Sequence, residues 1–183
     1  MSLKITSGFY EPVVARAIEY AKSKGVVCFA AAGNDFKKPV AFPGKHPDCL
    51  AISACGNVDG LPATAIDRWT VPRGDRSSMN SNLFLAKFSN IGKEGTSVDY
   101  IAPGAGIVAT VPGNNYAPMS GTSMACPAAV GAAAQILSEN PDILSLSGDH
   151  GRHFQFVNLI NSMSSSIGLS EEYEGNGMIS YSY

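Results

Sequence analysis

The hydrophobic pattern changes character several times along the chain, and each change predicts a new element. Residues 11–25 carry apolar positions at helical spacing, with a proline suited to the first turn and a glycine suited to the carboxyl-terminal cap. Residues 26–34 form an apolar run without alternation, typical of a parallel strand covered on both faces. Residues 49–56 and 98–104 predict two further strands. This order indicates an α/β fold with a mostly parallel sheet.

The middle of the chain is more polar and richer in turn formers. Residues 57–82 predict a long surface excursion, in which we expect Trp69 to cover the core. Residues 83–90 predict a strand, and residues 106–119 a hairpin that turns at Gly113-Asn114-Asn115. Sites in such folds lie at the carboxyl ends of the parallel strands.

The last third begins with a helix over residues 123–139 that is apolar on every side, so we expect it in the middle of the domain. An Asn-Pro pair ends this helix. The pattern beyond it predicts a polar loop at 145–153, a short helix at 154–163 and a closing strand at 177–183.

Bulk properties exclude several function classes. The 183 residues fit one domain, with 45% hydrophobic and 15% charged residues and a net charge of −2. Lysine and arginine are scattered rather than clustered, which argues against nucleic-acid binding. No apolar run approaches the roughly 20 residues that span a membrane, and the amino-terminal residues lack the pattern of a signal peptide.

The cysteines and histidines do not have the spacing of a zinc site, because Cys-x-x-Cys is absent and only three histidines occur. We expect free thiols and a reducing compartment, which favours the cytoplasm. Cys28 and Cys126 lie in apolar runs and are expected to be small core residues, so a reactive thiol at Cys126 is disfavoured.

The sequence GTSMACPAAVGAAA, residues 121–134, places hydroxyl groups directly before the apolar helix. Thr122 or Ser123 taken alone fits an ordinary helix cap. A serine there also has its own backbone N–H among the free donors of the helix start, and the helix dipole favours a nearby oxyanion. The hydroxyl needs a base to become nucleophilic.

Further segments agree with a catalytic interpretation of this serine. They are AAAGN at 30–34, FPGKHPDCLAISA at 42–54 and the stretch 98–125 that leads into the serine. In this order they resemble the subtilisin-like serine peptidases, the subtilases, over roughly residues 10–140. The resemblance implies that residues 1–183 are the carboxyl-side portion of a subtilase catalytic domain. We therefore expect an incomplete subtilisin-like three-layer α/β fold without its amino-side strands and helices, with 57–82 as a surface insertion.

The resemblance also assigns roles. Ser123 is similar to the nucleophile, and Asn34 to the side-chain donor of the oxyanion hole, which it shares with the Ser123 N–H. The primary specificity pocket is implied to have Ala30, Ala31, Ala32 and Gly33 along one wall and Ala41 near its floor. The implied substrate is a polypeptide.

Two triad members of the family have no counterpart here, because neither an Asp-[ST]-Gly nor a His-Gly-[ST]-His segment is present. Asp35, His46 and Ser123 occur in the family's order, but the contexts of the first two are wrong, so we disfavour this substitute triad. His150 and His153 offer a metal-binding alternative, against which we favour solvated loop residues. Pro127 is followed by Ala128 where the family usually has a histidine that serves packing.

Two functions remain open. The chain is expected to be a fragment of a serine endopeptidase, inactive in isolation because the Asp and His segments are absent. The alternative is a non-catalytic, subtilase-like module that binds peptides or proteins. An incomplete sheet exposes an edge, which predicts self-association. We expect no cofactor and no metal site, since no carboxylate cluster supports the calcium binding that subtilases often show.

Overall fold

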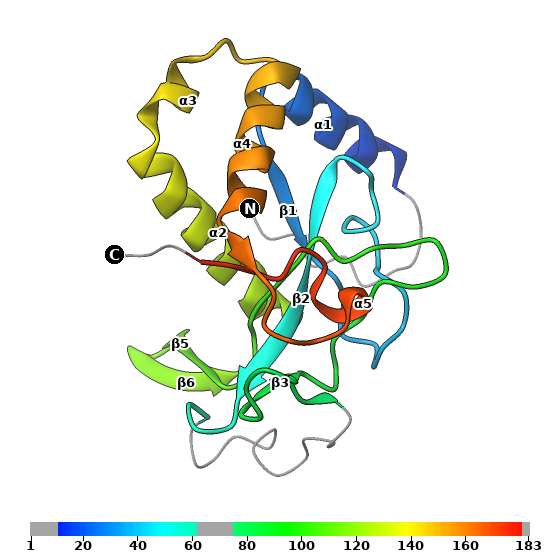
Figure 1. Ribbon diagram of the computed structural model, residues 1–183, viewed down its shortest axis with the longest axis vertical. Coiled ribbons are helices and arrows are strands. Elements are labelled where there is room, and N and C mark those ends of the chain that lie inside the picture. Colours follow the sequence, from blue (N-terminus) through cyan, green and yellow to red (C-terminus); the bar gives the residue numbers. More distant parts are fainter. Residues whose placement is uncertain (1–10, 62–74, 181–183) are drawn as a thin grey trace.

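The computed structural model describes residues 11–61 and 75–180, and Figure 1 shows their arrangement. The helices are α1 (Pro12–Ser23), α2 (Thr122–Glu139), α3 (Pro141–Ser145), α4 (His150–Ser162) and α5 (Glu171–Glu174). The strands are β1 (Cys28–Ala31), β2 (Cys49–Asn57), β3 (Leu83–Leu85), β4 (Tyr100–Pro103), β5 (Ile107–Val111), β6 (Asn115–Met119), β7 (Ser164–Ser165) and β8 (Met178–Ile179).

The main sheet has the order β1-β2-β4-β8-β7, and β3 pairs with β2. The pairings β1–β2, β2–β4 and β4–β8 are parallel, whereas β3 and β7 pair antiparallel. The predicted, mostly parallel α/β sheet is therefore confirmed. Among the described residues β1 pairs only with β2, so its other edge is free.

Helices cover both faces of the sheet and create three layers (Figure 1). On one face, Ala30 of β1 and Cys49 of β2 pack against Ile18 of α1. On the other face lies the main core, which joins the inner residues of β2 and β4 to α2 and α4. Successive side chains of β1 point to opposite faces of the sheet, so Phe29 packs into the main core beside α2 and Ala30 packs against α1.

The hairpin predicted at 106–119 is confirmed as β5 and β6, which form a separate two-stranded sheet beyond the main one (Figure 1). Gly113 and Asn114 have φ values of 85° and 56°, the left-handed conformations that a tight hairpin turn requires. Two other predictions need correction. The closing strand is only the short β8, and the strand predicted over 83–90 is limited to β3.

The carboxyl-terminal helices were also predicted with wrong boundaries. A short helix, α3, begins at Pro141, where the proline that ends α2 occupies the first turn of the next helix. Helix α4 begins at His150 rather than at 154, because the Asp149 carboxylate accepts hydrogen bonds from the N–H groups of Gly151 and Arg152. The polar segment 145–153 therefore includes the amino-terminal cap of α4, Asp149, as well as a loop.

Helix α2 is exposed along one side, contrary to the expectation that it is enclosed. Its buried side presents residues such as Ala125, Ala129 and Ile136 to the sheet. Its exposed side is also apolar, and Val130 there is 41% exposed. Over residues 127–134 the other exposed residues are Pro127, Ala128, Gly131 and Ala134, whereas the last turns of the helix expose the polar residues Gln135, Ser138 and Glu139. Composition alone predicted full burial, but no described element packs on this side.

The two ends of the predicted excursion at 57–82 lie side by side, since the Val58 N–H donates to the Asn82 carbonyl at 2.9 Å. Parts of it contribute buried side chains, because Leu61 is 4% and Asp75 is 5% exposed. Trp69 lies outside the described residues. The insertion itself stays a prediction. None of the helices in the described part is long and apolar enough to cross a membrane.

Asp99 leads into β4 and gives a pH-dependent prediction. Its carboxylate accepts a hydrogen bond from the Ala51 N–H at 2.7 Å, but burial outweighs this contact and raises the pKa of Asp99 above the ordinary 3.8. A raised folded-state pKa means that Asp99 stabilises the fold most when protonated, and that this contribution is lost as the pH rises through the folded pKa.

Asp99→Asn should therefore be more stable than the unsubstituted chain at pH 7, since the amide oxygen can accept the same bond without a buried charge. The gain should disappear as the pH falls below 3.8. Urea unfolding at both pH values measures this difference. A variant that is less stable at pH 7 would show that the carboxylate has a stabilising partner that outweighs its burial.

Candidate active site

The chain makes a strained turn after β1. Gly33 has a φ of 112°, and a Cβ at this position would lie 2.4 Å from the Asn90 side-chain nitrogen, so only glycine fits. Phe36 and Lys37 also have left-handed backbones, with φ values of 59° and 63°. Such conformations cost a side-chain-bearing residue about 1–2 kcal/mol each. We call residues 33–37 the Asn34 turn. Contacts with the surrounding structure must hold it in this conformation.

Thr122 links the Asn34 turn to the start of α2. The Asn34 Oδ1 accepts hydrogen bonds from the Thr122 N–H at 2.8 Å and from the Thr122 hydroxyl at 3.0 Å. The same hydroxyl accepts from the Gly33 N–H at 3.3 Å. A backbone N–H can only donate, so the atom that faces it must be the amide oxygen. This fixes the side-chain orientation of Asn34 and directs its NH₂ group away from Thr122.

Ser123 is the second residue of α2 and is partly exposed. The helix cap is Gly121, which makes no side-chain capping bond, so neither Thr122 nor Ser123 is an ordinary cap. The hydrogen bonds among the described residues leave the Ser123 N–H free, as expected for the first turn of a helix. A carboxamide, a free N–H and a serine hydroxyl thus come together at the carboxyl end of β1.

Asn90 supports the Asn34 turn from the other side and was not identified from the sequence. Its side chain is 1% exposed, accepts from the Asp35 N–H at 2.8 Å and donates to the Pro39 carbonyl at 3.1 Å. Its backbone N–H donates to the Gly33 carbonyl at 2.9 Å. The only signal in the sequence was an asparagine close to Gly92, and its partner 55 residues away could not be found from one sequence.

The residues expected to line a specificity pocket differ in exposure. The side chains of Ala30 and Ala32 are buried, at 7% and 0%. Ala31, Gly33 and Ala41 keep partial exposure, and the Ala41 N–H donates to the Ala32 carbonyl at 2.8 Å. The segment therefore presents Ala31, Gly33 and Ala41 beside Asn34.

The family model described as the subtilase family matches residues 2–161. This chain belongs to the subtilase family. Curated relatives include subtilisin DY of Bacillus licheniformis, 32% identical over 183 residues, which cover 98% of this chain and 53% of the relative. Alkaline elastase YaB of Bacillus sp. (strain YaB) is 28% identical over 179 residues, which cover 98% of this chain and 37% of the relative.

Solved structures of subtilisin-like proteases confirm the fold. S41 psychrophilic protease has a TM-score of 0.74 and 26% identity, and the match covers 99% of this subtilase chain and 56% of that structure. Sphericase has a TM-score of 0.71 and 24% identity, with 97% and 55% coverage. The fold is thus an incomplete subtilisin-like α/β fold, and the chain spans about half the length of these proteins or less.

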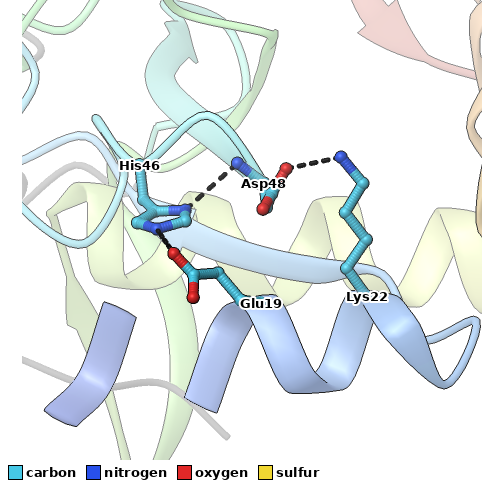
Figure 2. A network of polar contacts seen from close by, with 4 residues as sticks. All are labelled: Glu19, Lys22, His46 and Asp48. Atoms are coloured by element: carbon cyan, nitrogen blue, oxygen red, sulfur yellow. Dashed lines mark hydrogen bonds and ion pairs between the residues drawn. The ribbon is translucent and has the colours of Figure 1, made fainter. Parts of the chain in front are cut away.

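The histidines of this subtilase chain lie away from Ser123, at the amino ends of β1 and β2 and beside α1. The His46 Nδ1 accepts from the Asp48 N–H at 3.1 Å, and its Nε2 lies 3.8 Å from the Glu19 carboxylate (Figure 2). Asp35, by contrast, is held by Asn90. The structure therefore does not bring Asp35, His46 and Ser123 together.

His150 and His153 lie in the first turn of α4 rather than in a loop, and they line an open cavity of about 600 Å³ between α1 and α4. Burial, together with the nearby charge of Lys22, lowers the pKa of His153. Its imidazole is therefore neutral at pH 7. Within residues 11–61 and 75–180, no group of three or more His, Cys, Asp or Glu side chains could hold a metal ion.

The four cysteines are free thiols. Cys126, one helical turn beyond Ser123, is 3% exposed, and burial raises its pKa to about 11. Burial likewise raises the pKa of Cys49 to about 12. Both thiols stay protonated at neutral pH, which makes them poor nucleophiles, as expected for a core residue at Cys126.

Proposed function

We propose that this chain is the carboxyl-side portion of a subtilisin-like serine endopeptidase, in which Ser123 is the nucleophile and Asn34 belongs to the oxyanion hole. One observation carries the proposal: Thr122 joins the Asn34 amide to the helix start that bears Ser123. Core packing does not require this link, because Asn34 is exposed. The family relationship supports the same reaction class.

The geometry supports the following reaction. The Ser123 Oγ attacks the carbonyl carbon of a peptide bond while a base accepts its proton, and a tetrahedral oxyanion forms. The Asn34 NH₂ group and the Ser123 N–H donate to this oxygen, and the positive end of α2 stabilises it further. Collapse of the intermediate releases the amine with the base's proton and leaves an ester on Ser123, which water then hydrolyses.

The proton acceptor is the component that the described residues do not bring to Ser123. Since His46, His150 and His153 lie beside α1, we infer that the base comes from an amino-side part of the whole catalytic domain. An oxyanion site without its base retains only a small advantage over water. We therefore propose that the isolated chain is inactive. Ala31, Gly33 and Ala41 are proposed to contact the substrate beside the cleaved bond, with Ala30 and Ala32 contributing backbone.

A fluorophosphonate probe, which reacts with activated serines, tests this assignment. The isolated chain should not be labelled above its Ser123→Ala variant. A chimera that joins the preceding part of subtilisin DY to this chain should be labelled, and Ser123→Ala should abolish the labelling. A chimera that folds by circular dichroism but remains unlabelled would contradict the nucleophile assignment, and labelling of the isolated chain at Ser123 would contradict its inactivity.

A second candidate function is a non-catalytic module that binds another polypeptide, and two observations favour it. The outer edge of β1 is free among the described residues, and the exposed side of α2 is apolar over residues 127–134. Both surfaces suit association, including self-association through the sheet edge. Sedimentation equilibrium of the chain should then show concentration-dependent dimers. A monomer at every concentration, together with Ser123-dependent labelling of the chimera, would exclude this function.

A further inference from the structure

The Asn34 turn continues into Lys37, whose side chain has partners from two distant parts of the chain. The Lys37 Nζ lies 2.5 Å from the Asp75 Oδ1 and 3.5 Å from the Tyr173 hydroxyl. It also lies 5.2 Å from the centre of the Tyr173 ring, a distance at which cation–π attraction is effective. Two residues that lie 38 and 136 positions from Lys37 in the sequence thus meet at its ammonium group.

The partners of Lys37 are themselves firmly held. Asp75 is 5% exposed, so its carboxylate is removed from water and depends on protein contacts. The Tyr173 carbonyl accepts from the buried Ser53 hydroxyl at 2.6 Å, which fixes α5 against β2. Burial acts to lower the pKa of Lys37, but the hydrogen bond and charge of Asp75 outweigh it and raise this pKa. The ammonium group therefore stays charged.

The backbone around Lys37 explains why such a contact is needed. Phe36 and Lys37 both hold left-handed conformations, and their N–H groups donate to the Phe88 and Ser89 carbonyls at 3.1 and 2.9 Å. Strained residues persist only where several contacts restrain them together. The ion pair restrains the end of the turn that lies opposite Thr122.

We infer that Lys37 is a positioning residue for Asn34: its ion pair with Asp75 and its contact with Tyr173 keep the Asn34 turn in the conformation that seats Asn34 on Thr122. This rests on the proposed role of Asn34 in the oxyanion hole. It also gives the segment predicted as a surface insertion a function, because Asp75 belongs to it. Lys37 itself does not touch the reacting atoms.

Amide hydrogen exchange of the isolated, isotope-labelled chain tests this inference by NMR. The Thr122 N–H is the reporter, because it donates to the Asn34 Oδ1. Lys37→Met should accelerate its exchange about tenfold and shift the Asn34 side-chain amide resonances, since local opening of the turn would become more frequent. Lys37→Arg, which keeps the charge, should stay close to the unsubstituted chain.

The matched control is Lys22→Met. The Lys22–Asp48 pair has the same 2.5 Å separation and similar lysine exposure, 33% against 34%, but lies at the other end of β1 (Figure 2). It should leave the Thr122 exchange rate unchanged. Asp75→Asn, which preserves shape, is the second variant if Lys37→Met does not fold.

An unchanged Thr122 rate in the folded Lys37→Met or Asp75→Asn variant would overturn the inference, as would an equal acceleration in Lys22→Met. Failure of Lys37→Arg to restore the slow rate would also overturn it. Exchange requires no hydrolysis, so the result is independent of the fluorophosphonate experiment. Acceleration at Thr122 with an unlabelled chimera would uphold the positioning role and reject the peptidase assignment.

Discussion

Replacing Asn34 with leucine in the chimera with subtilisin DY is expected to lower kcat about a hundred- to thousand-fold, the range known for the oxyanion-hole asparagine of subtilisin, with little change in KM. Leucine has a similar volume but no hydrogen-bond donor. The loss should fall on kcat because the oxyanion forms only in the transition state, so an interaction with it does not contribute to substrate binding. Steady-state hydrolysis of a chromogenic peptide measures both constants.

Thr122 variants distinguish the effect of losing the Asn34 NH₂ donor from the effect of losing the hydroxyl that positions Asn34. Thr122→Val removes the hydroxyl that bonds Asn34 and Gly33 but keeps the backbone N–H, so its kcat should fall less than that of Asn34→Leu. Thr122→Ser should recover most of the activity. An Asn34→Leu variant with a raised KM and unchanged kcat would show that Asn34 binds the substrate rather than stabilising the transition state.

Replacing Glu174 with glutamine should destabilise the chain by about 1–2 kcal/mol, because the hydrogen bonds to a buried carboxylate are stronger than those to a neutral amide. Glu174 is 4% exposed, and its carboxylate accepts from the Ser166 hydroxyl and from the N–H groups of Ile167 and Leu169, the latter two at 3.0 and 3.2 Å. The glutamine NH₂ group can donate to the exposed Ser166 hydroxyl while its oxygen accepts from both N–H groups, so the loss comes from exchanging a charged acceptor for a neutral one.

Urea denaturation measures the change, and Glu172→Gln is the matched control. Glu172 lies in the same helix but is exposed, so its substitution should alter stability by less than about 0.5 kcal/mol. Equal stability of the Glu174→Gln and Glu172→Gln variants would mean that the loop at 166–169 does not depend on the carboxylate.

The sequence predicted those parts of the fold that are determined by residues close together in the chain. The apolar run at β1 and the turn at Gly113 were found because burial on both faces and left-handed turns each restrict residue type. The start of α4 was missed because the Asp149 cap lies among polar residues that resemble a loop. The exposure of one side of α2 could not be predicted, since an apolar helix sequence does not reveal which other elements pack against each side.

The candidate site likewise has residues that could be predicted from the sequence and residues that could not. Ser123 and Asn34 were predicted from specific motifs, and in the structure Thr122, the neighbour of Ser123, bonds to Asn34. The supports of Asn34 were not found, because Asn90 and Lys37 act through contacts with residues 55 and 38 positions away. Pairing over such distances depends on the tertiary fold, which one sequence does not reveal.

The contacts of the Asn34 turn come from α2, from residues 88–91 and from Lys37 with its partners, all within this chain. Under the proposed function, charge stabilisation and proton transfer are separable as physical modules, one folded in this chain and one supplied by the amino-side part of the catalytic domain. A small diffusible base, such as free imidazole, would then meet a serine whose proposed oxyanion donors are already positioned. The evolutionary corollary is that loss or gain of the proton-transfer module need not disturb the other.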